Sequence, residues 1–155
     1  IDTTPHNWAP KKWALSTAIE KVNTEIILQT DADCIPHSDW VKTMVQPFKK
    51  PETGFVSGPA PLSNNLTIID SIFEMDSLAQ DAFSAGGFSQ NLVFSCTGRN
   101  MGFTKQAFND VEGYKNISHF LSGDDDLLLH KITNHPHLFL YSFWTTNDQV
   151  YKTTS

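Results

Sequence analysis

The 155-residue sequence contains no long apolar run, no cluster of basic residues and no internal repeat. No segment approaches the roughly 18 consecutive apolar residues of a transmembrane helix, and none has the pattern of a signal peptide. The 11 Lys and Arg residues are outnumbered by 17 Asp and Glu residues, and the formal net charge is −6. An acidic chain without a basic patch argues against nucleic acid as a partner.

Cysteine is also scarce. Cys34 and Cys96 are the only two, and their spacing matches no disulfide framework. This usage is typical of a reducing compartment, so we expect a cytoplasmic protein. With 39% apolar and 18% charged residues, the chain has the composition of a globular protein. Its length suits one hydrophobic core and not two, so we expect residues 1–155 to form a single domain.

Apolar periodicity divides the chain into alternating helices and strands. The pattern predicts helices at 11–23, 40–48, 68–83, 105–109 and 127–132. It predicts strands at 25–30, 54–58, 92–96 and 138–141, with a Gly/Ser-rich loop at 84–91. Strands that alternate with helices favour an α/β fold with a mostly parallel sheet.

Two carboxylates, Asp31 and Asp33, directly follow the first predicted strand. In open α/β sheets, ligands bind outside the carboxyl ends of the strands. Carboxylate oxygens are ligands for Mg²⁺ or Mn²⁺, and such a metal usually also takes substrate phosphates. The pattern indicates a metal–diphosphate site. The alternative is a strand that ends in a polar turn, where Asp is favoured for its own reasons.

A second acidic cluster, Asp124-Asp125-Asp126, precedes the last predicted helix. An acidic helix N-terminus is the simpler interpretation, with Asp124 as the capping residue. One cap accounts for one acid and not for three. A carboxylate held beside a metal–diphosphate could instead act as general base toward an acceptor hydroxyl.

Two further segments carry polar groups suited to a ligand. Gly98 allows close backbone approach, Arg99 can bind a phosphate or carboxylate, and Asn100 can donate to and accept from hydroxyls. A plain turn is the alternative for this segment. Lys11 and Lys12 open a predicted helix, where an anion is favoured, and we expect Lys12 to contact the substrate. A solvated surface position is the commoner alternative for such a lysine.

Taken together, these segments resemble the inverting family 2 glycosyltransferases. The resemblance is carried in order by Lys11–Leu15, Asp31-Ala32-Asp33, Pro36 with Trp40-Val41, Thr97–Phe103 and Ser122–Leu127. It implies a GT-A fold, which is the Rossmann-like fold of nucleotide-diphospho-sugar transferases. It also implies a nucleotide-sugar donor, a carbohydrate or lipid-linked acceptor, and Mn²⁺ or Mg²⁺ as cofactor.

The resemblance also assigns roles. Asp31 and Asp33 would bind the metal, and Asp31 would also contact the donor. Asp125 would be the catalytic base, although a one-residue shift in the alignment would select Asp126. The residues assigned to substrate binding are Asp31, Gly98, Arg99, Asn100, Asp124, Asp126 and Lys12.

Two departures from the family pattern bear on the fold. In the family, a strand with the Asp that holds the nucleobase precedes the lysines, whereas here only a short loop does. The C-terminal Gln-x-x-Arg-Trp of processive synthases is absent. We therefore expect a central fragment of a catalytic domain, incomplete at both ends, that would meet the inner face of a membrane only through segments outside this chain.

Two other functions fit the same residues. A haloacid-dehalogenase-like phosphatase also has a strand that ends in Asp-x-Asp, and there Asp31 would be the nucleophile. A non-catalytic α/β binding domain could keep the acids as structural caps.

Overall fold

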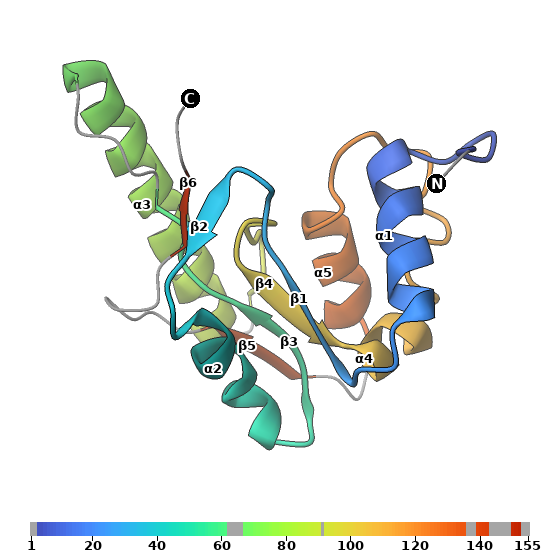
Figure 1. Ribbon diagram of the computed structural model, residues 1–155. Coiled ribbons are helices and arrows are strands. Elements are labelled where there is room, and N and C mark those ends of the chain that lie inside the picture. The colour runs from blue at the N-terminus through green and yellow to red at the C-terminus, as the bar shows by residue number, and fades with distance from the viewer. Residues whose placement is uncertain (1–2, 62–66, 91, 136–138, 143–149, 153–155) are drawn as a thin grey trace.

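The computed structural model describes residues 3–61, 67–90, 92–135, 139–142 and 150–152. Figure 1 shows an α/β arrangement in which helices flank a central sheet. The helices are α1 (Pro10–Lys21), α2 (Trp40–Val45), the 3₁₀ helix η1 (Pro47–Lys49), α3 (Ile68–Ser89), α4 (Lys105–Asp110) and α5 (Asp126–Thr133). The strands are β1 (Ile26–Gln29), β2 (Cys34–Pro36), β3 (Thr53–Ser57), β4 (Met101–Thr104), β5 (Phe139–Ser142) and β6 (Val150–Lys152).

The four-stranded sheet has the order β1-β4-β3-β5, and β2 pairs separately with β6. Strand β4 runs antiparallel to both of its neighbours, and only β3 and β5 are parallel. The expectation of a mostly parallel sheet is therefore wrong. Met101, the first residue of β4, pairs with the last residues of β1 and β3, Gln29 and Ser57. The chain therefore enters β4 at the end where its neighbours finish and runs against both of them.

Most predicted elements form where the periodicity placed them. The α/β class, α1, β1, β3, α4 and α5 are confirmed. The predicted strand 138–141 corresponds to β5, although Leu138 lies outside the described residues. Strands β2 and β6 are short and were not predicted.

The predictions for 84–96 are wrong. The helix α3 continues to Ser89 through the predicted loop, and 92–96 is irregular. Phe94 of this segment stacks on Phe83 of α3, with ring centroids 5.2 Å apart. Phe94 therefore packs on the helix, whereas Cys96 belongs to the core cluster of the sheet, and the missed strand β4 follows this irregular segment.

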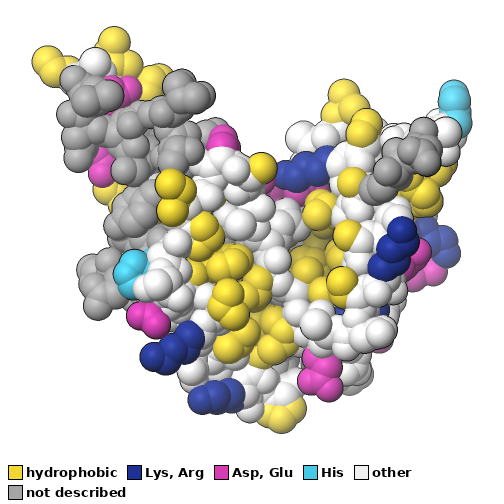
Figure 2. Space-filling view, in the orientation of Figure 1, with side chains coloured by type: hydrophobic (Ala, Val, Ile, Leu, Met, Phe, Trp, Pro, Cys, Tyr) yellow, Lys and Arg dark blue, Asp and Glu magenta, His cyan; other side chains and the backbone are white. Residues whose placement is uncertain are grey.

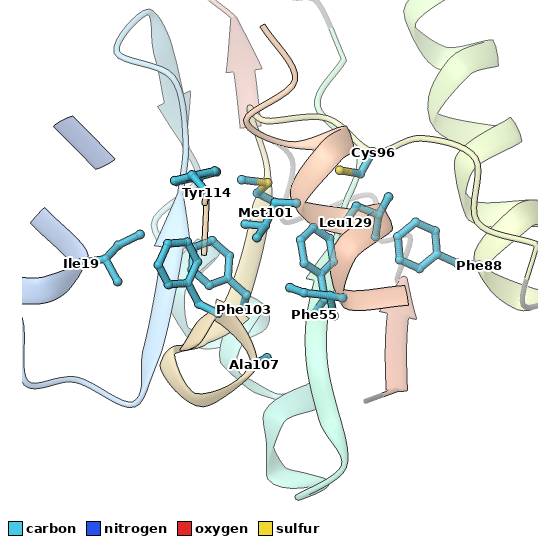
Figure 3. Packing of buried hydrophobic residues seen from close by; sticks show 12 residues of the cluster. Ile19, Phe55, Phe88, Cys96, Met101, Phe103, Ala107, Tyr114 and Leu129 are labelled. Carbon is cyan, nitrogen blue, oxygen red and sulfur yellow. The ribbon is translucent and has the colours of Figure 1, made fainter. Parts of the chain in front are cut away.

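The core lies on both faces of β3 and β4. Side chains alternate between faces along a strand, so the buried neighbours Phe55 and Val56 enter different clusters. Figure 3 shows the larger cluster, where Phe55, Phe103 and Leu129 pack between the sheet and α5. Val56 packs against α2. Among the described residues, no helix is both long and apolar enough to cross a membrane.

Candidate active site

The two acidic motifs meet at the end of β1. Gln29, the last residue of that strand, donates from Nε2 to Asp124 Oδ2 at 3.0 Å, across 95 residues of sequence. Lys11 Nζ lies 3.0 Å from the same Asp124 oxygen and 3.4 Å from Asp31 Oδ1. In Figure 2, basic side chains with acidic ones beneath them lie at the upper end of the hollow between the two sides of the molecule. The structure therefore brings polar side chains from three distant segments together at this end of β1.

Lys11 connects the two motifs through its charge. Its burial alone would lower the pKa of the ammonium, but the hydrogen bond to Asp124 and the charges of Asp124 and Asp31 outweigh that effect and raise it. Lys11 therefore remains protonated at neutral pH. Its side chain is half exposed, whereas that of Asp124 is 9% exposed. The ammonium can still meet an anionic ligand from solvent.

Asp125 contacts the segment that precedes β4. Its Oδ2 accepts from Gly98 N at 2.9 Å, and its Oδ1 accepts from Asp126 N at 2.8 Å. Asp125 is thus the N-cap of α5, and the expectation that Asp124 would cap this helix is wrong. Burial raises the pKa of the Asp125 carboxyl, and the neighbouring acids Asp126 and Asp124 add to that rise.

The segment 95–98, which precedes β4, is bound to the start of α5 through Gly98 and Asp126. A Cβ at position 98 would lie 3.0 Å from Asp125 Oδ2, so glycine permits the close approach of the backbone to that carboxylate. Asp126 Oδ1 accepts from Ser95 Oγ and Cys96 N, both at 2.9 Å. The structure therefore uses Gly98 and Asp126 within the protein, where the sequence suggested contact with a substrate. Of the three consecutive acids, Asp124 contacts Lys11 and Gln29, whereas Asp125 and Asp126 bind the segment 95–98.

Residues 1–112 match the model of the family described as Glycosyl transferase family 2. The chain belongs to the family 2 glycosyltransferases. The comparison with curated proteins found no match. Membership implies the GT-A fold, a nucleotide-sugar donor and an acceptor, and it favours glycosyl transfer over the phosphatase alternative. The matched range includes Asp31 and Asp33 and ends before Asp124.

In this family 2 glycosyltransferase, Asn100 has a structural role that the sequence did not indicate. The residue is fully buried. Its Oδ1 accepts from Trp40 Nε1 at 2.9 Å, and its Nδ2 donates to Pro59 O at 2.7 Å. Both ends of the amide bind groups of the protein, so Asn100 supports the fold, and its predicted contact with a substrate stays a prediction.

Arg99 of the glycosyltransferase turns toward α3. Its Nε donates to Thr97 Oγ1 at 3.2 Å, and its Nη2 donates to Ser77 Oγ at 3.3 Å. Its Nη1 is buried without a partner among the described residues. The contacts of Arg99 are thus to hydroxyls of the protein, and its predicted role toward a substrate stays a prediction.

Lys12 differs from both interpretations of the sequence. It is 1% exposed, and its Nζ donates to Phe120 O at 2.7 Å and to Ser122 O at 2.6 Å. Lys12 is therefore not a solvated surface lysine, and its hydrogen bonds go to the backbone. The lysine that contacts the acidic motifs is Lys11. The sequence indicated both lysines but led us to assign the ligand contact to Lys12, and it gave no indication of Gln29. A polar residue that ends an apolar strand could have indicated Gln29, but no local signal separates two adjacent lysines.

The remaining candidates of the glycosyltransferase concern a metal. Asp31 is half buried and Asp33 is exposed, and both lie in the turn between β1 and β2. The described residues contain no group of three or more His, Cys, Asp or Glu side chains that could hold a metal by themselves. Mg²⁺ usually takes one or two carboxylates and completes its shell with water and substrate phosphates. Asp31 and Asp33 fit such a partial site.

Proposed function

We propose that this glycosyltransferase transfers a sugar from a nucleotide-diphospho-sugar to an acceptor hydroxyl with inversion at the anomeric carbon. The observation that carries the proposal is the contact of Lys11 with both Asp31 and Asp124. It brings the two acidic motifs to the carboxyl end of β1, where ligands of α/β sheets bind. A carbohydrate or a lipid-linked sugar would be the acceptor.

The donor diphosphate would bind beside Lys11 and the Asp31–Asp33 turn. These two carboxylates would hold Mn²⁺ or Mg²⁺, and the ion would supply Lewis-acid stabilisation of the leaving diphosphate. Lys11 would supply a further positive charge to the same site. This role explains why a lysine lies beside acidic residues at a half-exposed position.

Asp125 would be the general base. The acceptor oxygen would form a bond to the anomeric carbon while the bond from that carbon to the diphosphate oxygen breaks, and Asp125 would take the hydroxyl proton. Each carboxylate oxygen has two lone pairs, so an oxygen that accepts one N–H can still accept a proton. The raised pKa of Asp125 supports this role, because a base is most effective when its pKa approaches the working pH.

The three acids can be separated by Asn variants, which keep the side-chain shape. For Asp125→Asn we expect kcat to fall by about 10²–10⁴-fold while donor affinity is retained. Asp124→Asn should weaken donor binding, because Lys11 loses the charged carboxylate that holds its ammonium in position. Asp126→Asn should mainly lower stability, because Ser95 and Cys96 lose a charged acceptor.

The measurements are steady-state transfer kinetics, donor calorimetry and urea unfolding for each variant, made in a catalytic domain that also carries the nucleobase-binding strand. Asp110→Asn, at an exposed position of α4, is the matched control. If the Asp126 variant is inactive and the Asp125 variant is active, the alignment is shifted by one residue. If all three variants retain full activity, the proposed mechanism is wrong.

A further inference from the structure

The buried ammonium of Lys12 is the feature that the proposed mechanism does not use. Both of its hydrogen bonds go to backbone carbonyls, those of Phe120 and Ser122, and both are short, at 2.7 and 2.6 Å. They join the first turn of α1 to a segment about 110 residues later in the sequence. That segment leads directly into Asp124 and Asp125.

Besides the bonds from Lys12, the segment 120–123 has local backbone bonds: Phe120 N donates to Ile117 O and Leu127 N donates to Gly123 O, both at 3.3 Å. The side chains of Phe120 and Leu121 are 49% and 84% exposed, so they add little buried packing. Gly123 has a φ of +76°, in the left-handed region, and a Cβ there would lie 2.9 Å from Leu127 Cγ. The backbone must therefore hold an unusual turn close to α5. The two hydrogen bonds from Lys12, on α1, hold the Phe120 and Ser122 carbonyls of this turn.

Burying the charged group of Lys12 is unfavourable, which is unexpected for a residue with only a packing role. Removing an ammonium group from water is unfavourable unless nearby groups compensate for the lost hydration. Burial lowers the pKa of Lys12, while the charges of Asp124 and Asp125 act in the opposite direction. The protein therefore holds a buried cation beneath the acids that the proposed function uses, where an apolar side chain could fill the same space.

We propose that Lys12 is a positioning residue: by holding the carbonyls of Phe120 and Ser122, it sets the position of Asp124 and Asp125 relative to the Asp31–Asp33 turn. The inference rests on the proposed function for its catalytic consequence. Its structural part, that Lys12 holds the segment 120–123 and through it the acids, does not depend on any activity.

The test compares Lys12→Met, which keeps the length but removes the donors, with Lys12→Arg, which keeps the charge and donors. Lys21→Met, at an exposed position in the last turn of the same helix, is the matched control. Amide hydrogen exchange is followed at Gly98 and Cys96, whose N–H groups donate to Asp125 and Asp126. The catalytic consequence is measured as kcat and donor KM in the transfer assay.

In Lys12→Met we expect exchange at Gly98 and Cys96 to accelerate about tenfold, while the amides of β3 and β4 stay protected. We expect kcat to fall about 10–100-fold with donor KM changed less than threefold, and Lys12→Arg to restore part of kcat. The Lys21→Met control should match the unmodified protein in every measurement.

Two results would overturn the inference. Unchanged exchange at Gly98 and Cys96 in a folded Lys12→Met variant shows that Lys12 does not hold the acids. Faster exchange with unchanged kcat shows that it holds them without any consequence for transfer. If the unmodified protein transfers no sugar, the proposed function fails, whereas the exchange measurement still decides whether Lys12 holds the segment.

Discussion

Lys11 and Lys12 are adjacent and chemically identical, yet their surroundings give them different roles. Successive residues of a helix point about 100° apart, so α1 directs one ammonium to the acids and the other beneath them. Lys11 contacts Asp31 and Asp124 near solvent, and Lys12 is buried against backbone carbonyls. At the scale of single residues, function is decided by the direction of a side chain and not by its type.

Asn100 allows a test of this point. We predict that Asn100→Ala lowers the free energy of unfolding by about 2–3 kcal/mol, because Trp40 Nε1 and Pro59 O lose their partners in a buried site. Urea unfolding measures the change, and Asn109→Ala, at an exposed position, is the control. Unchanged stability with a raised KM for a substrate would instead support the role that the sequence suggested.

Asp81 provides a prediction about pH. It is buried, and its Oδ2 accepts from Ala60 N at 3.0 Å. Burial raises the pKa of this carboxyl above its ordinary value, so the folded protein binds the proton more tightly than the unfolded chain. The resulting contribution to stability is present below the ordinary carboxyl pKa and is lost as pH rises through the raised one.

We therefore predict that Asp81→Asn gains stability relative to the unmodified protein as pH rises from about 4 to 7. The gain amounts to about 1.4 kcal/mol for each unit by which the pKa is displaced. The amide oxygen of Asn can still accept from Ala60 N. Urea unfolding at several pH values measures the difference, and parallel curves for the two proteins would contradict the prediction.

At the scale of elements, α3 shows how packing overrides a local signal. The pair Gly86-Gly87 predicted a loop, because glycine is unfavourable within a helix. The helix continues because Gly87 permits close packing. Leu92 N donates to Gly87 O at 2.9 Å, and a Cβ at position 87 would lie only 2.5 Å from Leu92 O. At Gly86, a Cβ would meet no atom within 4 Å.

The two glycines predict opposite effects of the same substitution. Gly86→Ala should stabilise the protein by about 0.5–1 kcal/mol, because alanine loses less backbone entropy in a helix. Gly87→Ala should destabilise it by about 1–3 kcal/mol, because the segment after α3 must move. Chemical denaturation of both variants measures the two changes. Equal effects of the same sign would show that the contact with Leu92 does not limit position 87.

For the whole molecule, the sheet has an open side. Strand β1 pairs with β4 along one edge, and its other edge pairs with no strand among the described residues. An apolar groove runs along this side, lined by α1 residues such as Leu15 and Val22 and by Ile26 and Leu28 of β1. Figure 2 shows hydrophobic side chains in this hollow. The candidate site lies at the end of the same strand.

This arrangement leads us to predict weak nucleotide binding by residues 1–155 alone. The groups at the site suit a diphosphate, and the nucleobase-binding strand of the family has no counterpart among the described residues. We expect a Kd weaker than about 1 mM for nucleoside diphosphates with Mn²⁺. Calorimetry with a panel of these nucleotides measures it. Micromolar affinity would show that the described residues suffice to hold the nucleoside.

Local sequence patterns by themselves determined the α/β class, the helices α1, α4 and α5, the strands β1 and β3, and the segments that carry the acids. Each follows from periodicity within a few turns or strand residues, so no distant contact is needed to predict it. The ordered motifs were also sufficient to suggest family 2 glycosyltransferases, which the family match confirms.

The tertiary structure alone decided the direction of β4, the continuation of α3, and which of Lys11 and Lys12 contacts the acids. It also decided that Asn100 belongs to the core and that Asp125 caps α5. Several of these outcomes depend on a contact between residues distant in sequence, such as Asn100 with Trp40 or Lys11 with Asp124. Such contacts are selected by the packing of the whole chain, because burial commits a polar group to whichever partner the fold brings to it.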